Sequence, residues 1–395
     1  MSSHLDSHPF IDFRLIRLNL RESDWMNLGE ARSKCQHLAG VPVQRKVALE
    51  LAKVTLIKGA VATTAIEGNT LTEEEVREYL DGRGQIERSR QYQLVEIENV
   101  LAAINEIDAA LQTRSPIPLT VGRILEVNRI LLNGTEHESS AIPGEFRRHS
   151  VVVGGGIYRG PDWDRVPELC EEMCRWMTSR FDQEAGGVCA NSEDERIAVA
   201  LIKAIVAHIY IAWIHPFGDG NGRTARLIEV QILSQAGVPL VATNLLSDHY
   251  NRTRDRYYRE LRAASANGGN LSSFTSYAIE GFVDGLRKQI LLVRDHQLEI
   301  AWKNHVHELV EGQTPAMHRR RSLLLDMPLK DWVKRSEVAK VSTRVALEYG
   351  GAGERTLPRD LNALVKEGLM VKGPKGYRVA VENVVAFVPT FDHRD

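Results

Sequence analysis

Residues 215–226 read His-Pro-Phe-Gly-Asp-Gly-Asn-Gly-Arg-Thr-Ala-Arg, and this stretch limits the folds open to the chain more than any other feature. Pro216 disfavours helical geometry at the residue before it, so the apolar periodic segment that precedes His215 is expected to end there. Three glycines then permit tight turns, and apolar spacing resumes after the stretch. The sequence therefore predicts a loop between two helices, with the second helix beginning in the glycine-rich turn.

The same loop carries the side chains of an anion site. The start of a helix presents unpaired N–H groups and the positive end of the helix dipole, and Arg223 and Arg226 lie three apart on that first turn. Asp219 supplies a carboxylate of the kind that Mg²⁺ binds together with phosphate oxygens, and His215 titrates near neutral pH and suits a general base. A structural turn with a capping aspartate and solvated arginines explains each residue alone but not the set. The loop is therefore predicted to bind a polyphosphate.

This stretch resembles the signature of the Fic family, His-x-Phe-x-Asp/Glu-Gly-Asn-Gly/Lys-Arg-x-x-Arg, and matches it at every specified position. Members of that family typically transfer the AMP of ATP to a Ser, Thr or Tyr hydroxyl of a protein and release pyrophosphate. The resemblance implies that His215 deprotonates the hydroxyl and that Asp219 binds Mg²⁺. It also implies contacts with the phosphates of ATP from Gly220, Asn221, Gly222, Arg223, Thr224 and Arg226.

A second motif lies upstream, where residues 63–70 read Thr-Thr-Ala-Ile-Glu-Gly-Asn-Thr. Thr63 and Glu67 are four apart and share a face of a predicted buried helix that ends near Gly68. A surface glutamate at a helix end is the plainer alternative, although the helix dipole disfavours negative charge there. The stretch resembles the family's inhibitory motif, Ser/Thr-x-x-x-Glu-Gly/Asn, which implies that Glu67 pairs with Arg226 and displaces the γ-phosphate. Autoinhibition is expected, and whether Glu67 also positions a water that removes AMP stays open.

Two weaker features concern the target and the adenine. β-branched runs around the glycines at 154–156 predict a β-hairpin, either an ordinary surface hairpin or, by resemblance, the flap that docks the target by strand pairing. The family often has two prolines after the aromatic residue of the flap, whereas Arg159-Gly160-Pro161 follows Tyr158 here. By resemblance Tyr257 lies beside the adenine pocket, and packing between helices is an equal alternative for that tyrosine.

The C-terminal part of the chain has a different organisation. Two helical segments precede a hairpin pattern around Lys372-Gly-Pro-Lys-Gly376, with Thr356 as the expected cap of the second helix, which is the order of a winged helix-turn-helix. Residues 330–378 contain 11 Lys and Arg against 6 Asp and Glu, a net charge of +5. Such a module binds DNA phosphates or docks a protein, and the sequence leaves both open.

Composition sets the remaining expectations. With 395 residues, 43% hydrophobic content and a net charge of −2, the chain is expected to be globular and cytoplasmic, without a membrane span or signal peptide. Four cysteines without paired motifs suit a reducing compartment, and no phosphate-binding P-loop motif is present. The predicted fold is mainly α, with a Fic helical core, a β-hairpin flap and a winged helix-turn-helix.

The predicted boundaries are an N-terminal helical region at 1–110 with the inhibitory motif, a Fic catalytic domain at 111–290, a linker helix at 291–320 and a winged-helix domain at 321–395. The predicted activity is AMP transfer from ATP with Mg²⁺ to a protein hydroxyl. The alternatives are transfer of UMP, phosphocholine or phosphate, or a DNA-binding regulator whose core senses a nucleotide. Self-modification and a homodimer stay open.

Overall fold

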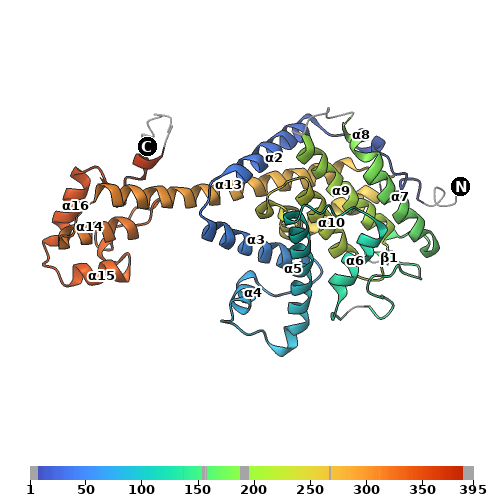
Figure 1. Ribbon diagram of the computed structural model, residues 1–395, viewed down its shortest axis with the longest axis horizontal. Helices are drawn as coiled ribbons and strands as arrows, with labels where there is room; N and C mark the ends of the chain where they lie inside the picture. The colour runs from blue at the N-terminus through green and yellow to red at the C-terminus, as the bar shows by residue number, and fades with distance from the viewer. Residues whose placement is uncertain are drawn as a thin grey trace. The chain divides into compact units, whose positions relative to one another are not determined.

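The computed structural model describes residues 8–136, 138–153, 156, 158–186, 195–266, 268–310 and 312–385. It divides into two compact units, Met1–Ile290 and Leu291–Asp395. The first contains the helices α2 (Glu22–Gly40), α3 (Arg45–Ala65), α4 (Glu73–Leu80), α5 (Gln91–Gln112), α6 (Val121–Leu132), α7 (Val166–Ser179), α8 (Phe181–Gly186), α9 (Arg196–Ile214), α10 (Asn221–Gln235), α11 (Leu245–Arg252), α12 (Arg254–Ala266) and most of α13 (Ser272–Leu309). The predicted mainly helical class is confirmed (Figure 1).

Two helices form the centre of the first unit, with α2, α5, α6 and α7 around them (Figure 1). α9 and α10 pack against one another more extensively than any other pair of elements, and α10 also contacts α3, α5 and α6. α9 has the length and apolar composition of a membrane span, with a mean hydropathy of 2.2, but 83% of that stretch is buried inside the unit. Its composition therefore fits a central core helix, and the loop that joins α9 to α10 is held by the core on both sides.

The turn after α3 carries the predicted inhibitory motif. α3 ends at Ala65, and Gly68 adopts a φ of +107°, a conformation that favours glycine. The Asn69 amide donates to the Gln93 carbonyl at 2.8 Å and to Glu96 Oε2 at 2.9 Å, and both acceptors belong to α5. These hydrogen bonds fix the turn against α5, so the position of the preceding glutamate is set by packing.

The second unit has its own apolar core, formed by residues that include Trp302, Leu323, Leu361 and Leu364. Its elements are the C-terminal part of α13, α14 (Pro315–Asp326), α15 (Thr343–Gly350), α16 (Thr356–Lys366) and an antiparallel hairpin of β3 (Met370–Gly373) and β4 (Gly376–Val379). Thr356 is the first residue of α16 rather than its cap. The order of two helices and a hairpin agrees with the sequence pattern, and the winged-helix assignment stays a prediction.

Candidate functional site

The loop between α9 and α10 has a fixed backbone. His215 follows α9 with a φ of +48°, rare for a residue other than glycine, and its N–H donates to the Ile211 carbonyl at 2.8 Å. Asn221, the first residue of α10, closes the loop, because its side chain accepts from the Phe217 N–H and donates to the Phe217 carbonyl, both at 2.9 Å. Gly220 has a φ of +78°. The predicted helix end, glycine turn and second helix are therefore all present.

Arg147 supports this loop from the segment ahead of the predicted flap. Arg147 is 3% exposed, and its guanidinium donates to the carbonyls of His215 at 2.8 Å, His149 at 2.7 Å and Pro161 at 2.5 Å. Its own N–H donates to the Pro216 carbonyl at 2.9 Å. Burial lowers the pKa of Arg147 below its ordinary value. Sequence reasoning missed this residue, which holds the unusual backbone of His215 from 68 positions away.

Replacement of Arg147 by methionine is expected to lower the free energy of unfolding by about 2–4 kcal/mol, because several buried carbonyls lose their donor at once. The measurement is chemical denaturation followed by circular dichroism. Arg148 is the matched control, since its side chain is 76% exposed and, among the residues that the structure describes, pairs only with Glu145, three residues away. Arg148→Met is expected to change stability by less than about 0.5 kcal/mol. Equal losses in the two variants would contradict the assignment of Arg147 as the support of the loop.

Asn128 of α6 is a second support that the sequence did not reveal. It is fully buried, donates to the Asp219 carbonyl at 3.0 Å and accepts from the Gly144 N–H at 3.1 Å. A Cβ on Gly220 would meet its amide nitrogen at 2.9 Å, so close approach adds to the positive φ in requiring glycine there. Thr224, predicted to contact the nucleotide, is fully buried with its hydroxyl 3.4 Å from the same amide. Its side chain therefore faces the loop support.

A cleft of about 790 Å³ opens over the start of α10. It is lined by residues of the α9–α10 loop, the flap, α12 and the turn after α3. The predicted site residues that line it are Glu67, His215, Asn221, Gly222 and Tyr257. The structure thus brings residues from distant parts of the sequence to one opening.

Both predicted arginines are paired with carboxylates. Arg223 lies 3.2 Å from Asp219 Oδ1 and 3.5 Å from an oxygen of Glu96, a partner on α5 that sequence reasoning missed. Arg226 Nη2 donates to Glu67 Oε1 at 2.6 Å and to the carbonyl of Thr63 at 3.0 Å. Thr63 therefore contacts Arg226 through its backbone carbonyl, whereas the motif specifies this position by its hydroxyl side chain.

The Glu67 carboxylate covers the guanidinium of Arg226. The Arg226 side chain has no solvent exposure, whereas the Glu67 side chain is 37% exposed and lines the cleft. Arg226 Nε and Nη1 are buried without a hydrogen-bond partner in the described part of the chain. A Cβ on Gly222 would collide with Glu67 Oε1 and lie 3.0 Å from Arg226 Nη1, so a larger residue there would require the ends of these two side chains to shift. The guanidinium keeps unused donors for an anion that displaces the glutamate.

The pKa of Glu67 lies below its ordinary value of 4.5. Burial alone would raise this pKa, but the charges of Arg226 and Arg223 and the hydrogen bond from Arg226 outweigh burial. A carboxyl with a lowered folded-state pKa contributes stability above its unfolded pKa and loses that contribution as pH falls through the lower value. The pair is therefore ionised at neutral pH, and mild acidification does not break it.

His215 is held as the neutral imidazole. Burial, reinforced by the charge of Arg147, lowers its pKa from 6.5 to about 4. A neutral imidazole has a lone pair that accepts a proton, which is the state a general base requires. His215 lines the cleft beside the start of α10, in the protonation state that a general base for a hydroxyl requires.

An NMR titration of the histidine side chains is expected to show His215 titrating below about pH 5 in the protein without nucleotide. The unfolded chain binds a proton at this residue below pH 6.5 and the folded protein does so only near pH 4, so His215 makes the fold less stable as pH falls through this interval. The resonance is assigned by its absence in His215→Ala. A titration midpoint at the ordinary value of 6.5 would contradict the buried, neutral state.

Tyr257 packs between helices and also lines the cleft, and its contact with adenine stays a prediction. It is 2% exposed, stacks with Tyr250 at 4.8 Å between ring centroids, and its hydroxyl lies 2.9 Å from Nε2 of the buried His208. The neighbouring Tyr258 donates from its hydroxyl to the Ile66 carbonyl at 3.2 Å, which ties α12 to the turn that carries Glu67. α12 thus forms a wall of the cleft and contacts the turn after α3.

Two cations of α12 also line the cleft and were not predicted. Arg259 and Arg262 lie three apart, on the helical face that presents Tyr258 and Asp255 to the same opening. They add positive charge to an opening that already has the N-terminus of α10. Asp255 and Glu67 line the same cleft, so the two arginines are partly offset by carboxylates.

The predicted hairpin lies beside the cleft. β1 (Val152–Val153) pairs antiparallel with β2 (Tyr158–Arg159), and Val153 is opposite Tyr158 in the register. Both residues line the cleft, and the Tyr158 hydroxyl donates to the Trp213 carbonyl in the last turn of α9 at 2.6 Å. The hairpin is thereby anchored two residues before His215. The glycines at 154 and 155 and the residue at 157, part of the same prediction, lie outside the described residues.

Asp219 has the surroundings of a carboxylate that shares a cation with phosphates. Its side chain is 28% exposed, and its Oδ1 accepts from the Gly220 N–H and from Arg223. No cluster of three or more His, Cys, Asp or Glu that would hold a metal occurs in the ranges the structure describes. Mg²⁺ requires no such cluster, because it commonly binds one or two carboxylates together with substrate phosphates and water. The residues present fit Mg²⁺ bound with a nucleotide.

Comparison with known proteins agrees with this arrangement. Residues 118–233 match the sequence model of the Fic/DOC family. Curated proteins described as protein adenylyltransferase Fic from Drosophila melanogaster and Drosophila simulans are each 32% identical over 215 residues, 54% of this chain. That match spans 38% of the length of each relative.

Solved structures show the same fold at low sequence identity. A Fic family protein from Desulfovibrio desulfuricans aligns with a TM-score of 0.56 and 20% identity, covering 91% of this chain and 97% of that chain. Fic-1 from C. elegans aligns with a TM-score of 0.53 and 22% identity, covering 69% of this chain and 73% of that chain. The likeness extends beyond the residues that match the family model and supports the helical core described above.

Proposed function

The chain carries a Fic/DOC-family domain at residues 118–233, and on that premise we propose that it is a protein adenylyltransferase that moves AMP from ATP to a Ser, Thr or Tyr hydroxyl of a target protein. The observation that carries this proposal is that one cleft is lined by the neutral His215, by the start of α10 and by Glu67, which pairs with the buried Arg226. The name of the Drosophila relatives, protein adenylyltransferase, supports the same reaction.

In the proposed reaction the neutral imidazole of His215 accepts the proton of the target hydroxyl. The hydroxyl oxygen bonds to the α-phosphorus of ATP, the bond from that phosphorus to the bridging oxygen breaks, and pyrophosphate leaves. The N–H groups at the start of α10, with Arg223 and Arg226, would hold the phosphates and place the α-phosphorus beside the hydroxyl. Mg²⁺ held by Asp219 and the phosphates would neutralise charge on the leaving group.

We also infer that this activity is restrained at rest by Glu67. Its Oε1 lies 2.6 Å from Nη2 of Arg226, so the carboxylate pairs with the guanidinium that the γ-phosphate would otherwise bind. Tyr258 and the hydrogen bonds of Asn69 hold the surrounding turn in place, so withdrawal of the glutamate requires that the turn move against α5 and α12. Because the pKa of Glu67 is lowered, the relief of inhibition is expected to come from a binding event rather than from a fall in pH.

The test uses the full chain with Glu67→Gly and ATP labelled at either the α- or the γ-phosphate, with Mg²⁺. Label from the α-phosphate that remains on the protein or on a lysate protein, with none from the γ-phosphate, is expected for AMP transfer. Mass spectrometry of the incubated protein then locates any self-AMP adduct. Transfer of γ-label would show phosphate transfer. A folded, ATP-binding variant that labels nothing would overturn the proposal, and omission of Mg²⁺ tests the role of Asp219.

A further inference from the structure

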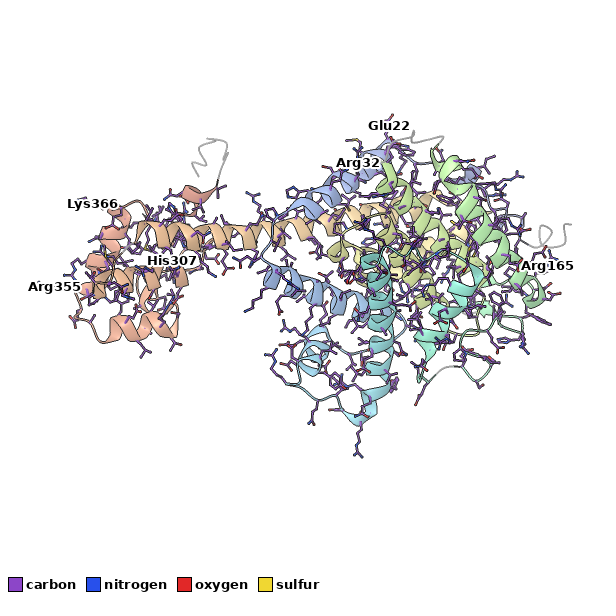
Figure 2. The ribbon with its side chains drawn as sticks, in the orientation of Figure 1. Glu22, Arg32, Arg165, His307, Arg355 and Lys366 are labelled. Atoms are coloured by element: carbon purple, nitrogen blue, oxygen red, sulfur yellow. The ribbon has the colours of Figure 1, made fainter. Side chains whose placement is uncertain are left out.

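One helix of the second unit presents a row of exposed polar side chains, three of them cationic and one an amide. Arg355, immediately before α16, and Arg359, Asn362 and Lys366 within it are all exposed. Their spacings of four, three and four residues place them on one face of the helix. Figure 2 shows Arg355 and Lys366 projecting from the surface of this unit. We call these four residues the basic face of α16.

The charge of this face is not neutralised within the unit. Arg355, Arg359 and Lys366 form no ion pair with any residue that the structure describes, although the exposed Glu354 flanks the face in sequence. The acid inside α16, Asp360, has no exposure and lies 3.4 Å from Arg319 and 3.1 Å from Arg320. Its negative charge is therefore turned away from the face and balanced from α14.

Several other cations of the same unit form ion pairs with nearby carboxylates, unlike the cations of the basic face. Arg344 pairs with Asp326 at 2.6 Å, Arg378 with Glu382 at 2.7 Å, and Lys330 with Asp295 at 2.5 Å. The positive charge of the unit is thus not spread evenly over its surface. The basic face of α16 and the adjoining hairpin carry most of the exposed Lys and Arg of the described unit that have no ion pair, and the others are Arg294, Lys334 and Arg335.

The hairpin after α16 adds two more such cations. β3 packs against α16, and Lys372 and Lys375 are exposed without an ion pair among the described residues. Gly373 pairs with Gly376 across a two-residue turn, and Gly376 adopts a φ of +126°. Lys375 therefore stands at the tip of a short, tightly closed hairpin beside the helix.

We propose that the basic face of α16 binds duplex DNA, with α16 in the major groove and the hairpin lysines on the flanking phosphates. The major groove admits an α-helix, arginine hydrogen-bonds guanine, and asparagine hydrogen-bonds adenine through two bonds. A protein partner is less suited, because the centre of a protein interface is enriched in aromatic and apolar groups and depleted in lysine. The four residues of this face include no apolar or aromatic side chain.

The test is fluorescence anisotropy of a labelled mixed-sequence duplex of about 20 base pairs with the full chain, at salt concentrations from about 50 to 200 mM. The variant is R355Q, R359Q and K366Q together. The matched control is R45Q, K46Q and R77Q, which removes two arginines and one lysine that are likewise exposed and unpaired in the described first unit. Thermal unfolding checks that both variants fold.

Removal of three cations from the helix in the groove is expected to make the slope of log Kd against log salt shallower by up to about 2.7, the value for three phosphate contacts, and to weaken binding at least about tenfold at low salt. The control is expected to bind as the wild type does. Asn362→Ala is expected to relax base preference in a duplex pool selected by the wild type. Absence of binding at low salt, or equal losses in variant and control, would overturn the proposal. A dimer that the variant abolishes, without DNA retention by the wild type, would identify the face as a protein interface instead.

Discussion

The replacement of His215 by alanine is expected to lower the rate of AMP transfer by about 10²–10⁴-fold, the contribution of a positioned general base. The imidazole is held neutral by burial, which lowers its pKa to about 4, so the base is in its proton-accepting form throughout the neutral range. The backbone that aims it is fixed by the Ile211 carbonyl and by Arg147, and neither contact involves the imidazole. The substitution therefore removes the base while leaving the loop in place.

The measurement is the initial rate of α-label transfer in the Glu67→Gly background, where basal activity is expected to be measurable. kcat is expected to fall while the affinity for ATP stays within about threefold, because the phosphates are held by the start of α10 and by the arginines. His37→Ala, at an exposed position of α2, controls for loss of a histidine elsewhere. A fall in ATP affinity with an unchanged kcat would assign His215 to binding and would count against its role as the base.

The local part of this site follows from the sequence because its causes are local. Pro216 ends α9, Gly220 permits a positive φ, and Asn221 caps the loop through residues four positions away. Such constraints act within a few residues, so the residue types in a short stretch of sequence predict them. The helical class follows in the same way from apolar periodicity in α9 and α10.

The supports of the site do not follow from the sequence. Arg147 and Asn128 bind the loop from 68 and 91 positions away, and Glu96 reaches Arg223 from α5. Each is an ordinary polar residue in a helix or ahead of a hairpin, and only tertiary packing gives it a partner. The same holds for the cations of α12, whose position on the cleft depends on how that helix packs against α9.

The direction in which a side chain faces is a further property that the motif does not determine. Thr224 lies inside a motif of nucleotide contacts, yet its hydroxyl is buried against Asn128. Thr63 acts through its carbonyl, because the last turn of a helix leaves carbonyl groups without intrahelical partners and one of them faces Arg226. A motif gives the residue types at a site, whereas the choice between backbone and side chain depends on local geometry.

Replacement of Glu67 by glycine is expected to raise AMP transfer by about 10- to 100-fold. Hydrogen bonds between charged groups contribute about 1.5–3 kcal/mol, and about 1.4 kcal/mol corresponds to a tenfold change. The variant frees Arg226 Nη2 from Glu67 and uncovers Nε and Nη1, which have no partner among the described residues, for the γ-phosphate. Glu67→Gln keeps the length of the side chain and removes its charge, so an intermediate gain is expected.

The same substitution is expected to lower stability without nucleotide by about 1–2 kcal/mol. Breaking a fully buried ion pair costs about 3–5 kcal/mol, and the 37% exposure of Glu67 reduces that cost. ATP is expected to raise the melting temperature of the variant more than that of the wild type, because it binds the folded state and supplies the charge that Arg226 has lost. Activity and stability thus change in opposite directions, which a general loosening of the fold would not produce.

The control is Glu87→Gly, which removes an exposed glutamate from another turn of the same unit. It is expected to leave transfer unchanged, since Glu87 forms no ion pair with either arginine of the loop in the structure as described. Transfer that is unchanged or lower in Glu67→Gly across several target proteins would refute autoinhibition, as would an equal gain in Glu87→Gly. A gain confined to Glu67 would mean that one carboxylate, held by the turn after α3, decides whether Arg226 is available to the γ-phosphate.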